Sequence, residues 1–170
     1  YNQYTKEPIN VILAKNLVGK QFGKKFISVT TQEELDAYAA TDKKIPYLLC
    51  ETFTGKELEG IKYEQLLPWA LPYENPENAF RVITGDFVTI EDGTGIVHTA
   101  PTFGADDAFV AKNAIPEVPP MLVLDKNENP VPLVDLQGRF TEHVGPHAGK
   151  YVKNEYYNDC EVPERSVDVE

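Results

Sequence analysis

The sequence predicts a mainly β domain with short helices, of the α+β class, folded as a compact β-barrel-like or strongly twisted unit. Two observations support this class: short apolar runs alternate with Gly- and Pro-rich turns along the 170 residues, and helix signals are few and short. With 42% hydrophobic residues the chain can bury a core, and its length suits a single domain over residues 1–170. The order of the elements argues against a succession of parallel β–α–β units.

The predicted strands are short and rich in β-branched or aromatic residues. They cover residues 10–15, 22–29, 46–53, 58–63, 80–84, 87–90, 94–100, 121–124 and 131–134. A Gly-Asp turn between residues 80–84 and 87–90 predicts a hairpin. The pair 121–124 and 131–134 is also hairpin-like. These pairings favour local antiparallel contacts.

Two helices are predicted from their first turns. Thr31 and Glu34 have the spacing of a capping box, which predicts a helix over residues 32–39. Residues 106–114 suit a second helix, with two acids in its first turn. Near the end of the chain, Ser166 resembles the N-cap of another helix.

Residues 65–77 are predicted to be a loop, because three prolines in this stretch disfavour both a helix and a central strand. The only tryptophan of the chain, Trp69, lies here and is expected to close one end of the core.

The charge balance is acidic: 16 Lys and Arg against 27 Asp and Glu give a net charge of −11. Such a chain is poorly suited to bind a nucleic-acid backbone, although it can bind one end of a nucleic acid if another part of a larger protein binds the backbone.

Cys50 and Cys160 form no CxxC motif, which favours a reducing compartment, and Cys50 is expected to be a buried, inert thiol. No apolar run is long enough to span a membrane, and no signal peptide is visible. The missing initiator Met predicts an excised or processed chain.

Several common chemistries lack their motifs. The only serines, Ser28 and Ser166, are outside any Gly-x-Ser-x-Gly motif. His143 and His147 have metal-ligand spacing only on a helix, and the Gly-Pro between them favours solvated loop histidines instead. Neither a dinucleotide fingerprint nor a phosphate loop is complete.

Residues 93–107 concentrate the remaining candidates, His98 with Asp106 and Asp107, among three glycines and a proline corner. They read as a turn, a short strand, a corner and a helix start. A structural interpretation makes His98 a half-buried strand residue and the acids ordinary partners of a helix N-terminus. A functional interpretation makes the same junction a small-ligand pocket. The residues alone leave both open.

The run Gly-Thr-Gly-Ile-Val-His-Thr-Ala-Pro at residues 93–101, followed by Gly-Ala-Asp-Asp at 104–107, resembles the signature of the editing domain of isoleucyl-tRNA synthetase. Residues 55–64 with Leu67 resemble a second segment of that domain, and the resemblance covers the whole chain. The valyl and leucyl editing domains share the Gly-Thr-Gly start and the later Asp, but usually lack the rest in this form. The isoleucyl domain is therefore favoured, with the valyl domain as the alternative.

The resemblance implies a deacylase that hydrolyses the aminoacyl ester of Val-tRNA(Ile), a proofreading step of protein synthesis. It implies that Asp107 pairs with the α-ammonium group of the substrate and that His98 helps to exclude isoleucine. Further substrate-binding residues implied by it are Thr94, Gly95, Thr99, Pro101, Gly104 and Asp106. No metal or cofactor is implied for this domain.

For the parent enzyme, the resemblance implies a cytoplasmic, monomeric isoleucine–tRNA ligase that uses ATP and Mg. The partners implied are the aminoacylated 3′ end of tRNA(Ile) and the remaining synthetase domains, with no membrane.

One family feature is missing. The threonine-rich segment Thr-Thr-Thr-Pro-Trp-Thr-Leu-Pro does not occur, and residues 68–72 resemble it only superficially. We therefore expect an excised fragment that lacks the upstream part of the pocket. Two alternatives to an active editing domain remain: a folded insertion module that is inactive in isolation, and an unrelated β-rich binding domain.

Overall fold

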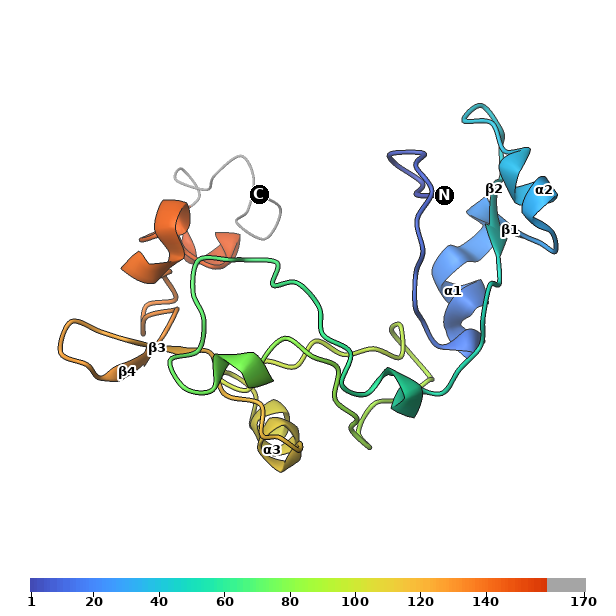
Figure 1. Ribbon diagram of the computed structural model, residues 1–170. Helices are drawn as coiled ribbons and strands as arrows, with labels where there is room; N and C mark the ends of the chain where they lie inside the picture. Colours follow the sequence, from blue (N-terminus) through green and yellow to red (C-terminus); the bar gives the residue numbers. More distant parts are fainter. Residues whose placement is uncertain (159–170) are drawn as a thin grey trace. The chain divides into compact units, whose positions relative to one another are not determined.

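The computed structural model describes residues 1–158 (Figure 1). The chain divides into two compact units, each described here by itself. The first unit comprises Tyr1–Glu57 and Thr84–His98, and the second comprises Leu58–Ile83 and the chain from Thr99 onward. Cys160 and the cap predicted at Ser166 lie outside the described residues.

Short helices and short strands make up the fold, so the mixed α+β class is confirmed. The α-helices are α1 (Val18–Phe22), α2 (Gln32–Asp36) and α3 (Ala105–Asn113), and the strands are β1 (Phe26–Val29), β2 (Ile45–Leu48), β3 (Leu122–Leu124) and β4 (Pro130–Pro132). The 3₁₀ turns are Lys15–Leu17, Gly23–Lys25, Gly55–Leu58, Pro76–Asn78, Glu142–His147 and Asn154–Tyr156. The strands form two two-stranded sheets, so residues 1–158 contain no closed barrel.

In the first unit, β1 and β2 pair in parallel, with Phe26 opposite Ile45 and Val29 opposite Leu48. Residues 30–44, which include α2, form the crossover between them. A parallel pair needs such a connection, because its strands must enter the sheet from the same end. The sequence predicted no succession of parallel β–α–β units, and residues 1–158 contain one such unit, whose parallel pairing was not predicted.

The capping box predicted at the start of α2 is present. The Thr31 side chain accepts a hydrogen bond from the Glu34 backbone N–H at 3.2 Å, and the Glu34 carboxylate accepts from the Thr31 N–H at 3.2 Å. The same carboxylate accepts from the Thr30 N–H at 2.8 Å. These donors, the Thr30 N–H first, hold the pKa of Glu34 below its ordinary value.

The second unit contains α3 and the antiparallel pair β3–β4, both close to their predicted positions.

Two five-residue turns of this unit have the same pattern of hydrogen bonds. Asp125 accepts from the N–H groups of Asn127 and Asn129, and Asp135 accepts from those of Gln137 and Arg139. The fourth position of each turn has a positive φ, 61° at Glu128 and 80° at Gly138. An aspartate at the start and a left-handed fourth residue therefore close both turns.

Several predicted strands are absent. Residues 10–15 and 94–100 form no strand, and residues 22–25 are helical. The hairpin predicted for residues 80–84 and 87–90 is also wrong. Instead, Phe80 and Val82 exchange backbone hydrogen bonds with Tyr63, Ile61 and Gly60. A short apolar run does not specify its partner, and here the partner lies upstream in the chain.

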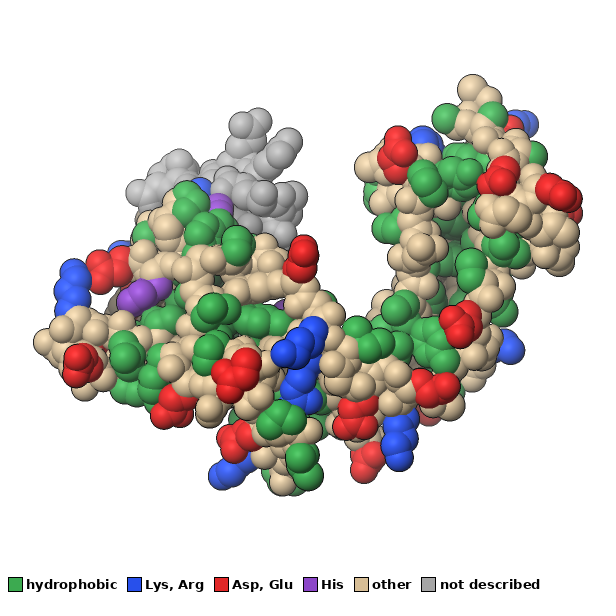
Figure 2. All heavy atoms as spheres, in the orientation of Figure 1, with side chains coloured by type: hydrophobic (Ala, Val, Ile, Leu, Met, Phe, Trp, Pro, Cys, Tyr) green, Lys and Arg blue, Asp and Glu red, His purple; other side chains and the backbone are tan. Residues whose placement is uncertain are grey.

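The core of each unit is small. Buried apolar residues of the described chain other than proline are Leu17 and Ile45 in the first unit and Ala79, Ala111, Val123 and Val144 in the second. Large apolar side chains at Leu66, Ile115 and Leu136 are 90–101% exposed. Figure 2 shows hydrophobic side chains scattered over the visible face of the described residues. None of the helices in this part of the chain has the length and apolar character to cross a membrane.

The capping box gives α2 a defined pH response. Because the folded pKa of Glu34 is lowered, its stabilising effect is complete above the unfolded pKa and is lost as the pH falls through the folded pKa. We expect hydrogen-exchange protection of the α2 amides to decrease below about pH 4 in the native chain and to lack this step in Glu34→Gln. Glu33→Gln removes a neighbouring charge without touching the cap and should keep the step. Identical profiles for the two variants would contradict the assignment.

Candidate functional site

Within the second unit, the signature forms a tight turn leading into α3. The carbonyl of Ala100 accepts hydrogen bonds from the N–H groups of Phe103 at 3.0 Å and Gly104 at 3.2 Å. Gly104 is the N-cap of α3, and its backbone is extended with no side chain to cap the helix. The Thr102 hydroxyl oxygen is buried and has no hydrogen-bond partner among residues 1–158. Both of these backbone hydrogen bonds of the turn therefore end at the carbonyl of one residue, Ala100.

Asp107 ties this turn to the helix. Its carboxylate oxygen Oδ2 accepts the backbone N–H of Ala100 at 3.0 Å, and the side chain is half-buried. Asp107 lies in the first turn of α3, where a negative charge interacts favourably with the helix dipole. Asp106, next to it, is exposed. The two neighbouring acids thus differ, and Asp107 is the one held in a fixed place.

In the first unit, Gly95 is packed against the segment that precedes Lys15–Leu17. The Ala14 N–H donates to the Thr94 carbonyl at 2.7 Å. Gly95 has a φ of 77°, and a Cβ at this position would lie 2.6 Å from the Ala14 Cβ. Glycine is therefore needed here both for its backbone conformation and for the close approach of Ala14.

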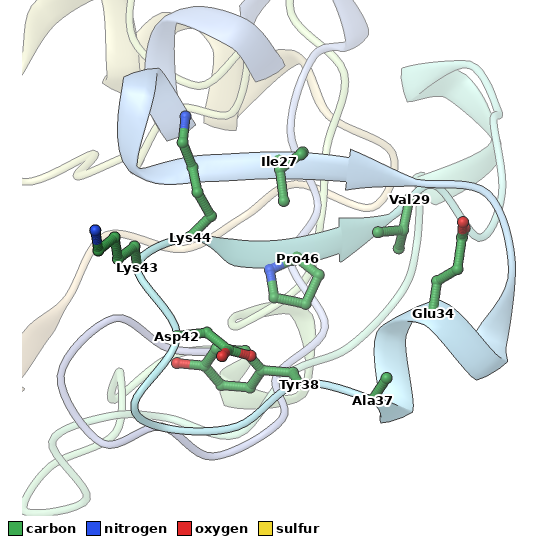
Figure 3. Close-up of a pocket in the computed structure, with 9 residues that line it drawn as sticks. All are labelled: Ile27, Val29, Glu34, Ala37, Tyr38, Asp42, Lys43, Lys44 and Pro46. Carbon is green, nitrogen blue, oxygen red and sulfur yellow. The ribbon is translucent and has the colours of Figure 1, made fainter.

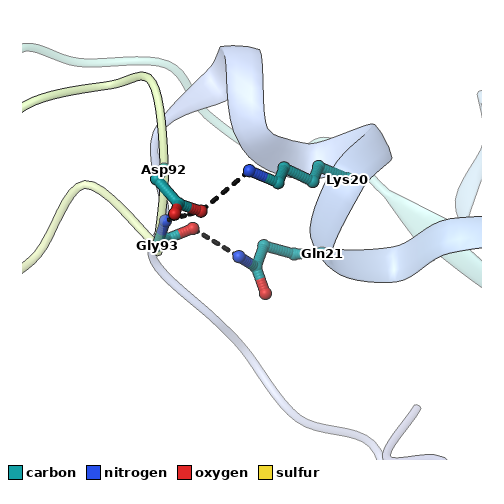
Figure 4. A network of polar contacts seen from close by, with 4 residues as sticks. All are labelled: Lys20, Gln21, Asp92 and Gly93. Atoms are coloured by element: carbon teal, nitrogen blue, oxygen red, sulfur yellow. Dashed lines mark hydrogen bonds and ion pairs between the residues drawn. The ribbon is translucent and has the colours of Figure 1, made fainter.

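Polar contacts hold the same turn to α1 (Figure 4). Lys20 and Asp92 form an ion pair at 2.8 Å between exposed side chains. The Gln21 side-chain amide donates to the Gly93 carbonyl. The Lys20 ammonium and the Gly93 N–H hold the pKa of Asp92 below its ordinary value, with the Lys20 hydrogen bond as the larger cause. Residues 92–95 are thereby held against α1 and Ala14.

His98 is exposed and lies outside any strand. The strand predicted over residues 94–100 is therefore wrong, and so is the structural interpretation of His98 as a half-buried strand residue. A strand needs backbone hydrogen bonds to another segment of the chain. Within residues 94–100 only the Thr94 carbonyl makes such a bond, to the Ala14 N–H, and the Thr94 hydroxyl bonds the backbone of Ile96 nearby. Ile96 and Val97 are about half exposed, at 51% and 48%.

The signature residues thus divide between the units. Thr94, Gly95 and His98 belong to the first, whereas Thr99, Pro101, Gly104, Asp106 and Asp107 belong to the second. Within the second unit the structure brings Asp107 together with Gly104 and the backbone of Ala100. The contributions of Ala100 and Ala14 have no signal in the sequence, because a backbone N–H and a methyl group are common to many residues.

The two histidines that were predicted to lie in a solvated loop, His143 and His147, each contact specific neighbours. His143 bonds the Leu124 carbonyl and the Thr141 hydroxyl, and His147 packs edge-on against Trp69 with ring centroids 4.9 Å apart. Both histidines are partly buried, so the expectation of solvated loop residues is corrected. Within residues 1–158 no group of three or more His, Cys, Asp or Glu side chains is placed to hold a metal ion.

Cys50 is exposed, which corrects the expectation of a buried thiol. The strand predicted over residues 46–53 ends at Leu48, so Cys50 lies beyond the sheet.

A shallow cavity of about 420 Å³ lies in the first unit, and none of the residues that line it belongs to the signature. Figure 3 shows its lining, with side chains of β1 and β2 on one side and the residues of and after α2 on the other. The apolar lining comes from Ile27, Val29, Pro46, Ala37 and Tyr38, and charged groups lie at its rim. Glu34, one of these, is already engaged in the capping box.

Known proteins similar to this chain match it along its length. The protein from Cytophaga hutchinsonii named isoleucine–tRNA ligase is 52% identical over 161 residues, 95% of this chain and 14% of the relative. Proteins of the same name from Porphyromonas gingivalis and Bacteroides fragilis are 46% and 42% identical, and cover 100% and 99% of the chain. No protein-family model matches the chain.

These relatives show that the chain is homologous to a segment of aminoacyl-tRNA ligases. Within that class it corresponds to a fragment of isoleucine–tRNA ligase, and it spans 14–16% of the length of these relatives.

Gly95 provides a test of the packing in the first unit. Gly95→Ala adds an overlap with Ala14 to the cost of a positive φ, whereas Gly93, with a φ of 67° and no neighbour within 4 Å, has the conformational cost alone. We expect Gly93→Ala to lower the free energy of unfolding by about 1–2 kcal/mol. We expect Gly95→Ala to lower it by about 1–3 kcal/mol more, because overpacking adds to strain.

The measurement is urea denaturation of both variants, followed through NMR signals of residues in the first unit. Equal losses for the two variants would mean that Ala14 does not constrain residue 95.

Proposed function

We propose that the chain is the editing domain of an isoleucine–tRNA ligase and hydrolyses the ester that joins valine to tRNA(Ile). The observation that carries this proposal is the signature at residues 93–107, in a chain similar along its whole length to proteins named isoleucine–tRNA ligase. The parent would be a cytoplasmic ligase that uses ATP and Mg for its synthetic reaction and acts as a monomer.

A second site of this kind answers a physical need. A pocket that fits isoleucine rejects valine by one methylene, worth about 1–3 kcal/mol, a limit for which isoleucyl-tRNA synthetase is itself the usual worked example. Binding alone therefore gives too little discrimination for accurate protein synthesis. Hydrolysis at a separate site that admits only the smaller amino acid supplies the remaining accuracy.

We assign Asp107 to the α-ammonium group of the bound aminoacyl ester. The Ala100 N–H holds Oδ2, and the half-buried position lowers the surrounding dielectric, which strengthens a charge-assisted hydrogen bond. A carboxylate that is fixed before binding loses little freedom when the ammonium group arrives. The anchoring seen at Asp107, and absent at exposed Asp106, favours Asp107 for this role.

The other proposed roles follow the resemblance. His98 limits the size of the accepted side chain, and the remaining contacts are assigned to Thr94, Gly95, Thr99, Pro101, Gly104 and Asp106. In the reaction, water attacks the carbonyl carbon, the ester C–O bond breaks, and a ribose hydroxyl of the terminal nucleotide leaves with a proton as valine is released. An aminoacyl ester is already activated, so a positioned water suffices without a protein nucleophile or a metal.

The partners are the 3′ end of tRNA(Ile) and the other domains of the parent. Because the chain carries a net charge of −11, we assign most of the grip on the tRNA backbone to those domains. The second candidate is a folded insertion module that is inactive alone, favoured by the 14–16% of the relatives that the chain spans. Deacylation of Val-tRNA(Ile) by the isolated chain separates the two.

The role of Asp107 is tested in the parent enzyme by Asp107→Asn. The amide oxygen of asparagine can still accept the Ala100 N–H, so this variant removes the charge and keeps the turn. We expect kcat/KM for deacylation of Val-tRNA(Ile) to fall roughly 10- to 100-fold, the value of a hydrogen bond to a charged group. Glu117→Gln removes an exposed carboxylate of the same unit and should leave the rate unchanged. Undiminished hydrolysis by Asp107→Asn would refute the assignment.

The role of His98 is tested through selectivity. His98→Ala in the parent should make Ile-tRNA(Ile) a substrate, so that the ratio of Val- to Ile-tRNA(Ile) deacylation falls by about 10-fold or more. His143→Ala, which removes a histidine bonded to the Leu124 carbonyl, is the control and should keep the ratio. An unchanged ratio in His98→Ala would exclude His98 from size selection.

A further inference from the structure

The backbone at Gly104 does not itself require glycine. Its φ of −117° and ψ of 131° lie in the extended region that every residue adopts. As the N-cap of α3 the position would favour Ser, Asp or Asn, whose side chains can accept a hydrogen bond from the helix. Neither conformation nor helix capping explains why this position lacks a side chain.

The space beside Gly104 is occupied by Asp107. A Cβ at residue 104 would lie 2.7 Å from Asp107 Oδ2, 3.0 Å from Cγ and 3.2 Å from Cβ. The first distance is well inside the ordinary van der Waals contact of about 3.5 Å. A side chain at residue 104 and the present position of the Asp107 carboxylate therefore exclude each other.

Any movement of the carboxylate that relieves this overlap displaces the oxygen that forms its anchor. Oδ2, the atom nearest to the added Cβ, is the one that accepts the Ala100 N–H at 3.0 Å. Ala100 is itself fixed, because its carbonyl accepts from Phe103 and Gly104. In the described part of the chain, Oδ1 has no hydrogen bond to another protein group. The space left at Gly104 thus lets the carboxylate keep one oxygen on the Ala100 N–H, while the other makes no hydrogen bond within residues 1–158.

We propose that Gly104 is a positioning residue, whose missing side chain holds the Asp107 carboxylate with Oδ2 on the Ala100 N–H and Oδ1 presented to the α-ammonium group of the substrate. This inference rests on the proposed function of Asp107. It replaces the substrate contact assigned to Gly104 from the resemblance with an indirect role that acts through Asp107.

The test uses the parent enzyme and two esters of tRNA(Ile). One carries valine, and the other carries 2-hydroxyisovalerate, in which a neutral hydroxyl replaces the ammonium group at nearly the same size. Because the Asp107 carboxylate recognises the charge, the native enzyme should prefer the valyl ester when the hydrolysis of each ester is expressed relative to its uncatalysed rate. We expect Gly104→Ala to lower kcat/KM for the valyl ester by roughly 10- to 100-fold and to change hydrolysis of the hydroxy ester little.

The double variant Gly104→Ala with Asp107→Asn should be no slower than the slower single variant, because both changes remove the same interaction. Gly19→Ala is the matched control, since Gly19 has no atom within 4 Å of its added Cβ and no positive φ. Aminoacylation of tRNA(Ile) by each variant reports on folding of the parent. In the 170-residue chain, the Ala100 amide signal should shift in Gly104→Ala and stay in place in Gly19→Ala.

The outcomes distinguish a failure of the inference about Gly104 from a failure of the proposed function of Asp107. If Asp107→Asn loses the preference for the valyl ester while Gly104→Ala keeps it, the inference about Gly104 is overturned and the proposed function stands. If Asp107→Asn keeps the preference, the proposed role of Asp107 is wrong and the inference fails with it. An equal loss for both esters in Gly104→Ala indicates general damage to the unit, and this also overturns a positioning role.

Discussion

The hydrogen bond from the Ala100 N–H to Asp107 Oδ2 is the interaction on which the candidate site depends. α3 begins without a side-chain cap, and the loop before it closes only on the Ala100 carbonyl. The carboxylate joins these two weakly specified pieces and places a negative charge in the first helical turn, where it is favoured. One acid thereby stabilises the local fold and is held in the position that its proposed chemistry requires.

The first unit reaches a defined local geometry by a different route. There the constraint is steric: Ala14 approaches the backbone of residues 94–95 more closely than any side chain at Gly95 would allow. Gly95 and Gly104 look alike in the sequence, yet one accommodates a neighbouring segment and the other accommodates an acid of its own loop. The glycines of the signature are therefore better understood through what lies against them than through flexibility.

The sequence was sufficient to predict those elements that depend on residues close together in the chain. The Thr31–Glu34 pair located the start of α2, acids located α3, and the spacing of two apolar runs located β3–β4. The strands predicted for residues 10–15 and 94–100 failed because a strand needs a partner, which composition does not name. The parallel pairing of β1 with β2 was missed for the same reason.

In the candidate site too, the residues could be predicted from the sequence, but the partner that holds them could not. The family resemblance singled out Asp107 and Gly104, but the partner that anchors the acid is a backbone N–H, which every residue except proline carries. Which of two adjacent aspartates is anchored depends on the helical position of each, and the sequence gives that only after the helix start is known.

The division of the chain into units has a consequence for the order in which the protein assembles. β1 and β2 pair across a short connection, whereas the contact of Ala14 with Thr94 joins residues 80 positions apart. Residues 58–83, which belong to the second unit, are made between these two partners on the ribosome. The N-terminal segment must therefore wait for residues 84–98 to emerge before it can dock. Closing so long a loop costs more chain entropy than forming the β1–β2 pair, so we expect this contact to form late in folding.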